Sequence, residues 1–382
     1  MRATPGPPGS PAHGPGTTPD PNAGPFETLD LGAPTVGGVG LCLSGGGYRA
    51  MVFHLGALRR LNEAGWLPKL TRVASVSGGS IVAGVLGLGW RDLDFDGDGV
   101  ARRFADLVEE PILRLAGTTV DVPAVLNGLV SGGASRRVQA SYDRYLFHGA
   151  TLQDLPADDE GPRFILLATN LSNGTLWRFS RPYMRDWRSE PVNNPTLPLA
   201  HAVAASSAFP PVLSPCRLRI PGRDVVTLTD GGVFDNLGLE PVLKRCATLF
   251  VSDGGGTFKE QPKPPGDWLR GTLRVLSTVD VQVRRLRRRQ LMDALESGQR
   301  AGSFWAVNSL QAEFSGRSPN LPCPEEESRA LAATPTRLAA MSPETRHRLV
   351  NWGYGLTDAA LRTFVDPGLP EPAGFPHPGG IG

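Results

Sequence analysis

The stretch Leu41-Cys-Leu-Ser-Gly-Gly-Gly-Tyr-Arg-Ala50 ends a short apolar run in three glycines and then opens into an apolar pattern with helical spacing. A second stretch, Ser75-Val-Ser-Gly-Gly-Ser80, ends the next apolar run in a serine that small residues surround. Each stretch predicts a strand that turns sharply into a helix. Two such turns side by side can build an acyl-transfer site, in which one holds an oxyanion and the other presents a nucleophile.

Strand and helix patterns alternate along the rest of the chain. Strands are predicted at residues 39–44, 72–76, 163–169, 175–180, 225–229 and 247–252, and the last of these is the last clear one. Helical patterns start at residue 49 and recur at residues 78–88, 199–207, 275–295 and 338–352. This alternation predicts an α/β fold with a largely parallel sheet.

The composition is that of a globular protein, with 40% hydrophobic and 20% charged residues in a chain of 382. That length suffices for a sizeable core. A formal net charge of +2 gives no overall reason to expect nucleic-acid binding. The four cysteines lack metal-ligand spacing, so we expect reduced thiols in a cytoplasmic protein and no zinc site or disulfide framework.

The two ends differ in composition from the part between them. Residues 1–25 are rich in Pro, Gly and Thr without an apolar core, so we expect a disordered tail rather than a signal or anchor. Residues 26–366 are expected to form a single domain, and the Pro/Gly-rich residues 367–382 a loose tail. The longest apolar segment, residues 81–90, is far shorter than the ~20 residues that span a bilayer.

Ser77 is the candidate nucleophile. A nucleophile elbow needs small residues two positions to either side, and here these are Ser75 and Gly79. The alternative is a serine that only caps the following apolar helix. The residues Gly45, Gly46 and Gly47 favour the catalytic interpretation, because glycines at a helix start free backbone N–H groups for a developing negative charge. A phosphate-binding loop is disfavoured, since neither Gly-Lys-Ser/Thr nor G-x-G-x-x-G spacing is present.

Arg49 would either add a fixed charge beside this loop or lock it by hydrogen bonds to carbonyls. Asp230 is the candidate base, because it ends a predicted strand and precedes two glycines. An Asp-Gly turn is the alternative. His347 and His377, which follow Asp230 in the chain, both have the sequence context of surface residues, so a Ser–Asp dyad is favoured over a triad.

Two charged patterns have structural interpretations that we prefer. Alternating aspartates begin like a calcium loop, but position 12 of that register is Arg103, so we expect a surface turn without metal. Five arginines between Arg284 and Arg289 lie on the predicted helix 275–295. A solvated helix face is the simpler explanation, and contact with anionic lipid headgroups is the alternative.

The three motifs in this order resemble the patatin-like phospholipase family. They read Gly45-Gly46-Gly47-Tyr48-Arg49, Ser75-Val76-Ser77-Gly78-Gly79 and Asp230-Gly231-Gly232, and Ser75 stands where many members have glycine. The likeness runs over residues 40–364, and Ala204-Ala-Ser-Ser-Ala-Phe-Pro-Pro211 and Asn351-Trp-Gly-Tyr-Gly355 resemble the bacterial branch.

The resemblance implies a three-layer α/β/α fold related to the catalytic domain of cytosolic phospholipase A2. It also implies a lipid acyl hydrolase that needs no metal or other cofactor, with Ser77 as nucleophile and Asp230 as base. Gly45, Gly46 and Gly47 would form the oxyanion hole with the support of Arg49. Phospholipid or another lipid ester would be the substrate, with peripheral contact at the inner membrane left open. The alternatives are a soluble esterase or acyltransferase on this fold, and a lipid-binding protein without turnover.

Overall fold

The computed structural model describes residues 37–120, 133–211, 213–256, 260–314 and 321–382. The tail expected at residues 1–25 lies outside these ranges. A ten-stranded sheet runs in the order β10-β9-β1-β2-β3-β4-β5-β6, and β8 pairs with both β3 and β7. Five strands form its parallel half: β10 (Ala301–Ala306), β9 (Thr248–Asp253), β1 (Val39–Leu43), β2 (Leu70–Val76) and β3 (Arg163–Asn170).

The five remaining strands pair in antiparallel fashion: β4, β5 and β6 extend the sheet beyond β3, whereas β8 pairs with the end of β3 and with β7. They are β4 (Thr175–Phe179), β5 (Tyr183–Arg185), β6 (Val192–Asn193), β7 (Cys216–Leu218) and β8 (Val226–Asp230). The apolar runs that predicted β1, β2 and β3 are almost wholly buried, as the two-sided cover of a parallel sheet requires.

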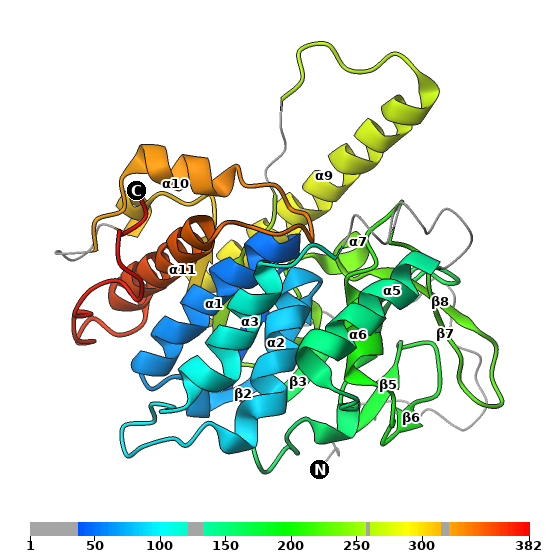
Figure 1. Ribbon diagram of the computed structural model, residues 1–382, viewed down its shortest axis with the longest axis horizontal. Coiled ribbons are helices and arrows are strands. Elements are labelled where there is room, and N and C mark those ends of the chain that lie inside the picture. The colour runs from blue at the N-terminus through cyan, green and yellow to red at the C-terminus, as the bar shows by residue number, and fades with distance from the viewer. Residues whose placement is uncertain (1–36, 121–132, 212, 257–259, 315–320) are drawn as a thin grey trace, which may run out of the picture. The chain divides into compact units, whose positions relative to one another are not determined.

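Helices cover both faces of the sheet (Figure 1). One group packs together around α1 and α2, and it comprises α1 (Gly47–Glu63), α2 (Gly78–Gly89), α3 (Glu110–Ala116), α5 (Gly133–Tyr142), α6 (Leu199–Ser206) and α11 (Pro343–Phe364). The other group comprises α7 (Gly232–Asp235), α8 (Glu240–Leu243) and α9 (Trp268–Glu296). In that group α8 contacts β1 and β2, and α7 contacts both β3 and α9. The arrangement is the expected three-layer α/β/α fold.

Several shorter helical segments complete the described structure. They are α10 (Glu325–Ala332), the π-helical η3 (Ala105–Glu109) and η4 (Asp143–Phe147), and the 3₁₀ segments η1 (Leu67–Lys69), η2 (Trp90–Asp92), η5 (Leu152–Asp154) and η6 (Gln311–Phe314). None of the helices in the described ranges is long and apolar enough to cross a membrane.

Several elements differ from the expectation: the short strands β5, β6 and β7 were not predicted, and α9 begins at Trp268 rather than at residue 275. The last strand is β10 rather than the strand at residues 247–252. It was not predicted because Ala301–Ala306 contains none of the β-branched residues that signal a strand. Within it Gly302 has φ +122°, and a side chain there would overlap the Leu249 carbonyl on β9. The final helix runs over Pro343–Phe364 rather than residues 338–352. It begins at the Ser342-Pro343-Glu344 start signal, where the Ser342 hydroxyl caps it by accepting a hydrogen bond from the Thr345 N–H.

The C-terminal residues 367–382 are packed rather than loose. The Asn351 side chain on α11 donates to the carbonyl oxygens of His377 and Gly380, at 2.9 and 2.6 Å, and accepts from the His377 N–H at 3.0 Å. Ile381 is buried. Composition does not predict this packing, because it depends on a few specific contacts, such as those of the Asn351 amide and the buried Ile381, and not on the proportion of proline and glycine.

Candidate active site

The two strand-to-helix turns lie in backbone contact at the ends of the neighbouring parallel strands β1 and β2. A side chain at Gly78 would overlap the Gly47 carbonyl, and one at Gly79 would overlap the Leu43 carbonyl. The Gly79 N–H donates to the Ser44 carbonyl oxygen at 3.2 Å. These glycines are required because the two backbones approach too closely for any Cβ.

Ser77 occupies the apex of the second turn in a strained conformation. Its φ of 52° and ψ of −119° are values that residues with a side chain seldom adopt. The Ser77 N–H donates to the Ser206 hydroxyl of α6 at 2.9 Å. That hydroxyl continues into a buried chain through Ser80 to Ser75, with oxygen–oxygen distances of 2.8 and 3.0 Å. Ser75 therefore fits where many relatives have glycine, since its hydroxyl helps to hold the elbow.

Asp230 ends β8 and lies buried beside Ser77. Its Oδ1 accepts a hydrogen bond from the Gly232 N–H at 2.7 Å. Burial raises the pKa of Asp230 to about 7, against the lowering effects of the Gly232 N–H and the Ser77 hydroxyl; Asp280 on α9 raises it further. Oδ2 is buried and makes no hydrogen bond of ordinary geometry within the described residues, so the Ser77 contact is a loose one. Catalytic hydrogen bonds are often long before substrate binds.

The glycine loop between β1 and α1 presents backbone N–H groups beside this pair. Gly46 and Gly47 both have positive φ, 147° and 59°, and α1 begins at Gly47. N–H groups in the first turn of a helix have no carbonyl partner one turn earlier, which makes them available to an anion. The Gly45 N–H differs, because it donates to the Asn236 carbonyl oxygen at 3.1 Å. The geometry thus favours Gly46 and Gly47 as oxyanion donors, with Gly45 fixing the loop.

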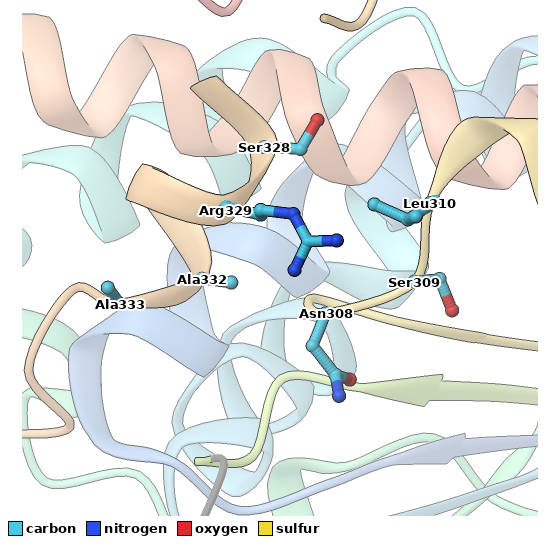
Figure 2. A pocket seen from close by; sticks show the side chains of 7 residues that line it. All are labelled: Asn308, Ser309, Leu310, Ser328, Arg329, Ala332 and Ala333. Carbon is cyan, nitrogen blue, oxygen red and sulfur yellow. The ribbon is translucent and has the colours of Figure 1, made fainter. Parts of the chain in front are cut away.

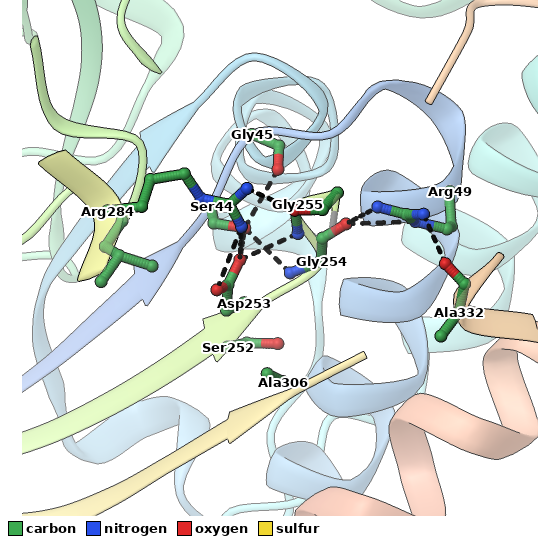
Figure 3. A network of polar contacts seen from close by, with 12 residues as sticks. Ser44, Gly45, Arg49, Ser252, Asp253, Gly254, Gly255, Arg284, Ala306 and Ala332 are labelled. Carbon is green, nitrogen blue, oxygen red and sulfur yellow. Dashed lines mark hydrogen bonds and ion pairs between the residues drawn. The ribbon is translucent and has the colours of Figure 1, made fainter. Parts of the chain in front are cut away.

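Arg49 is buried, and its guanidinium points at backbone carbonyls (Figure 3). It donates to Gly254 at 3.0 Å, and to Ala332 and Thr334 at 2.7 and 2.8 Å. Burial lowers the pKa of Arg49 to about 10, so the side chain stays charged at neutral pH. Of the two roles considered for Arg49, locking the loop is the one that this geometry supports.

A second buried network lies beneath the glycine loop (Figure 3). The Ser44 hydroxyl bonds to the Asp253 carboxylate at 3.0 Å and accepts from the Gly254 N–H at 2.8 Å. Arg284 of α9 pairs with Asp253 at 3.3 Å. Burial raises the pKa of Asp253, but Arg284, the Gly255 N–H and Ser44 lower it below the ordinary value overall. Sequence reasoning missed Asp253, although an aspartate that ends a strand before glycines is the same signal that identified Asp230.

The histidines lie elsewhere. The His347 and His377 rings stack with centroids 4.2 Å apart, and His377 Nε2 is 3.0 Å from a Glu109 carboxylate oxygen. His54 is buried between the Ser252 hydroxyl and the Ser44 carbonyl, and burial lowers its pKa to about 4, so it is neutral. Among the contacts of the described residues, none joins a histidine to Ser77 or Asp230.

The sequence matches the family model of patatin-like phospholipase over residues 41–243, which is more than half of the 382-residue chain. The chain belongs to the patatin-like phospholipase family. The matched region contains Ser77, Asp230 and the glycine loop. No curated protein matches the sequence.

A solved structure shares the fold of this patatin-like chain. Human GIVD cytosolic phospholipase A2, in complex with methyl gamma-linolenyl fluorophosphonate inhibitor and terbium chloride, aligns over 85% of the chain with a TM-score of 0.52 and 16% identity. VipD from Legionella pneumophila aligns over 85% with a TM-score of 0.35 and 18% identity. The chain covers 57% and 66% of those two chains, less than two thirds of either.

Two other features of this patatin-like chain lie apart from Ser77 and Asp230. The Asp96 carboxylate accepts hydrogen bonds from the N–H groups of Asp98 and Val100, and the described residues contain no cluster of three potential metal ligands. A pocket of about 280 Å³ lies between α10 and the segment after β10, where Arg329 reaches in from α10 (Figure 2). Its lining does not include Ser77 or Asp230, and Ala332, whose carbonyl binds Arg49, is its link to the loop.

Proposed function

We propose that the protein hydrolyses fatty-acyl esters of phospholipids through the dyad Ser77–Asp230. The observation that supports this most directly is a buried carboxyl group, with its pKa near 7, beside a serine at a strained elbow. Ordinary aspartate, with a pKa of about 3.9, is a weak base at neutral pH. Burial makes Asp230 basic enough to accept the Ser77 proton.

The reaction proceeds in two steps. Asp230 Oδ2 takes the hydroxyl proton as Ser77 Oγ attacks the ester carbonyl, and the N–H groups of Gly46 and Gly47 bind the resulting oxyanion. Collapse of this intermediate expels the lysophospholipid alcohol, which receives the proton from Asp230. Water then attacks the acyl-enzyme with Asp230 as base, and the fatty acid leaves as Ser77 regains its proton. The role of Gly45 is to hold the loop, and Arg49 supports it.

Exposed apolar side chains beside the dyad suit a lipid substrate. Phe209 follows Ala208, whose carbonyl accepts the Asp230 N–H at 3.0 Å, and Val233 lies three residues after Asp230. Both are large hydrophobic residues exposed to solvent. They would contact the acyl chain of a lipid that enters from a surface.

The cellular location, the extent of the domain and the branch of the family are proposed from the sequence. We place the protein in the cytoplasm, with peripheral contact at the inner membrane and a single catalytic domain over residues 26–366, on which residues 367–382 pack. The segments 204–211 and 351–355 favour the bacterial branch of the family.

The test is fatty-acid release from mixed phospholipid vesicles, without added metal, by wild type, Ser77→Ala and Asp230→Asn. We expect release by wild type alone. Retained activity in Asp230→Asn would contradict the dyad. Hydrolysis of monomeric short-chain esters in preference to vesicles would favour a soluble esterase, and no hydrolysis of either by folded protein would favour a lipid-binding role.

A further inference from the structure

The helix α9 carries large apolar side chains on its solvent face, from its first residue to Leu286. Trp268 is 81% exposed, and Val275, Val279 and Leu286 are each more than half exposed. These four residues follow one another at intervals of 7, 4 and 7. At 100° per residue they lie within about 40° of one another around the helix, and so form one stripe.

Away from these four residues, the exposed surface of α9 carries two more leucines, Leu273 and Leu276, and several arginines. The helix contains seven arginines and three acidic residues, and only one of the acidic residues, Asp280, precedes the last arginine. Arg284 and Arg287 point inward, where Arg284 pairs with Asp253, and Arg287 lies over the Phe234 ring of α7 and pairs with Glu240. Arg270, Arg285 and Arg289 lie exposed away from the stripe, and Arg288 is exposed with its guanidinium over the Phe304 ring of β10.

We propose that the α9 stripe, defined as Trp268, Val275, Val279 and Leu286, docks the protein on an anionic lipid surface. An amphipathic helix with an aromatic and aliphatic face and an arginine-rich face lies in the plane of such a surface. A second copy of the chain fits less well, because pairing two α9 helices would bring the arginines of both together, and like charges at an interface oppose association.

The inward side of α9 connects the docking surface to the reacting groups. Arg284 contacts Asp253 and the Gly256 carbonyl, beside the loop that holds Arg49. Arg287 contacts Phe234, four residues after Asp230. The helix that carries the stripe is therefore also in contact with the segments that border the candidate site. This inference rests on the proposed function for its substrate, but binding and turnover can be measured separately.

The binding test uses Ser77→Ala, which cannot turn over lipid, in sedimentation with phosphatidylcholine vesicles that contain or lack phosphatidylserine. We expect binding to the anionic vesicles only. Adding Trp268→Ser, Val275→Ser and Val279→Ser should lower the partition coefficient at least tenfold. Adding Arg285→Gln, Arg288→Gln and Arg289→Gln should lower it by about fivefold per arginine.

The matched control replaces three exposed arginines on other elements, Arg102, Arg114 and Arg329, by glutamine, with the same loss of net charge. We expect this control to bind nearly as well as Ser77→Ala. Equal binding by the stripe variant and Ser77→Ala would overturn the proposal. So would a dimer in solution that the stripe substitutions separate without a change in vesicle binding.

A second assay separates the two proposals. It measures hydrolysis of a short-chain monomeric ester and of vesicles by a protein that carries the stripe substitutions and keeps Ser77. We expect unchanged ester hydrolysis and reduced vesicle hydrolysis. Vesicle hydrolysis that is equally fast with and without the stripe would also overturn the docking proposal. Absence of ester and lipid hydrolysis in wild type would count against the proposed function alone, because the binding result with Ser77→Ala would still stand.

Discussion

Two residues at the candidate site hold conformations or environments that oppose folding. Ser77 has a backbone conformation that favours glycine, and Asp230 is a carboxyl group without full hydrogen bonding in the interior. Each feature costs stability and each serves the proposed chemistry. Variants that relax either feature are therefore expected to stabilise the fold and abolish turnover.

The backbone strain at Ser77 is testable with two inactive variants. Ser77→Gly removes the Cβ that disfavours φ 52°, so we expect its free energy of unfolding to exceed that of Ser77→Ala by roughly 1 kcal/mol. Both variants lose the hydroxyl, and both should fail to release fatty acid. Urea denaturation of the pair measures the difference. A glycine variant less stable than the alanine variant would show that the turn is not strained.

The raised pKa of Asp230 predicts two pH dependences. Because the carboxylate is the base, kcat/KM should rise with pH through about 7 and level off above it. The folded state holds the Asp230 proton more tightly than the unfolded state. The contribution of this group to the free energy of unfolding is therefore fully present below about pH 3.9 and is lost as the pH rises to about 7. The loss amounts to at most about 4 kcal/mol.

Asp230→Asn has no charge to bury, so its unfolding free energy should gain on that of wild type as pH rises from 5 to about 7, and the gap should level off above that. Thermal or urea unfolding across that range measures the gap. A gap that stays constant with pH would contradict the raised pKa.

At the scale of elements, the helix pair α1 and α11 shows how glycine sets packing distance. A side chain at Gly353 of α11 would overlap the Phe53 carbonyl of α1, and one at Gly56 of α1 would overlap the Val350 carbonyl of α11. The two backbones are therefore in direct contact. This contact holds α11 against the helix that begins at the glycine loop.

Two helical glycines are expected to respond oppositely to alanine. Gly353→Ala should lower the free energy of unfolding by about 1–3 kcal/mol, because the helices must separate. At Gly271 on α9 the nearest atom to a new Cβ is the Pro265 carbonyl oxygen, at an ordinary 3.7 Å, so alanine should be neutral or stabilise by up to ~1 kcal/mol. Thermal unfolding of both variants checks the sign. Equal effects would contradict the close contact.

At the scale of the whole molecule, residues far apart in the chain converge on the site. Ser77 follows β2, Asp230 ends β8, and Ser206 on α6 holds the elbow. The C-terminal residues join the same assembly, since they pack on α11, which packs on α1. The proposed site is therefore assembled from elements that lie far apart in the sequence, and it forms only when these elements pack together.

Packing of the C-terminal residues predicts a large effect from a residue near the chain end. Ile381 is 1% exposed, so Ile381→Ala should lower the free energy of unfolding by about 2–5 kcal/mol. The control is Leu171→Ala, where the side chain is 51% exposed and a change within about 0.5 kcal/mol is expected. Urea denaturation compares the two. Equal changes would show that the segment is not held in solution.

The sequence by itself determined the α/β architecture, because strand and helix periodicities depend on local alternation of apolar residues. It also marked the turns that carry Ser77 and Gly47, where sharp backbone geometry restricts residues to small types. It did not reveal β10, whose small residues form a strand only because β9 lies beside them. Nor did it reveal the packing of residues 367–382, which depends on contacts with distant residues such as Asn351, Arg348 and Arg60.

Only the tertiary structure decided how the site residues divide their tasks. The Gly45 N–H is engaged by Asn236, and Arg49 is engaged by carbonyls, because segments more than 180 residues away in the chain fold onto the loop. The pKa of Asp230 depends on burial by the surrounding elements, and the position of Asp253 beneath the loop depends on the pairing of β9 with β1. Distances and burial across the fold set these properties, and local patterns in the sequence do not encode them.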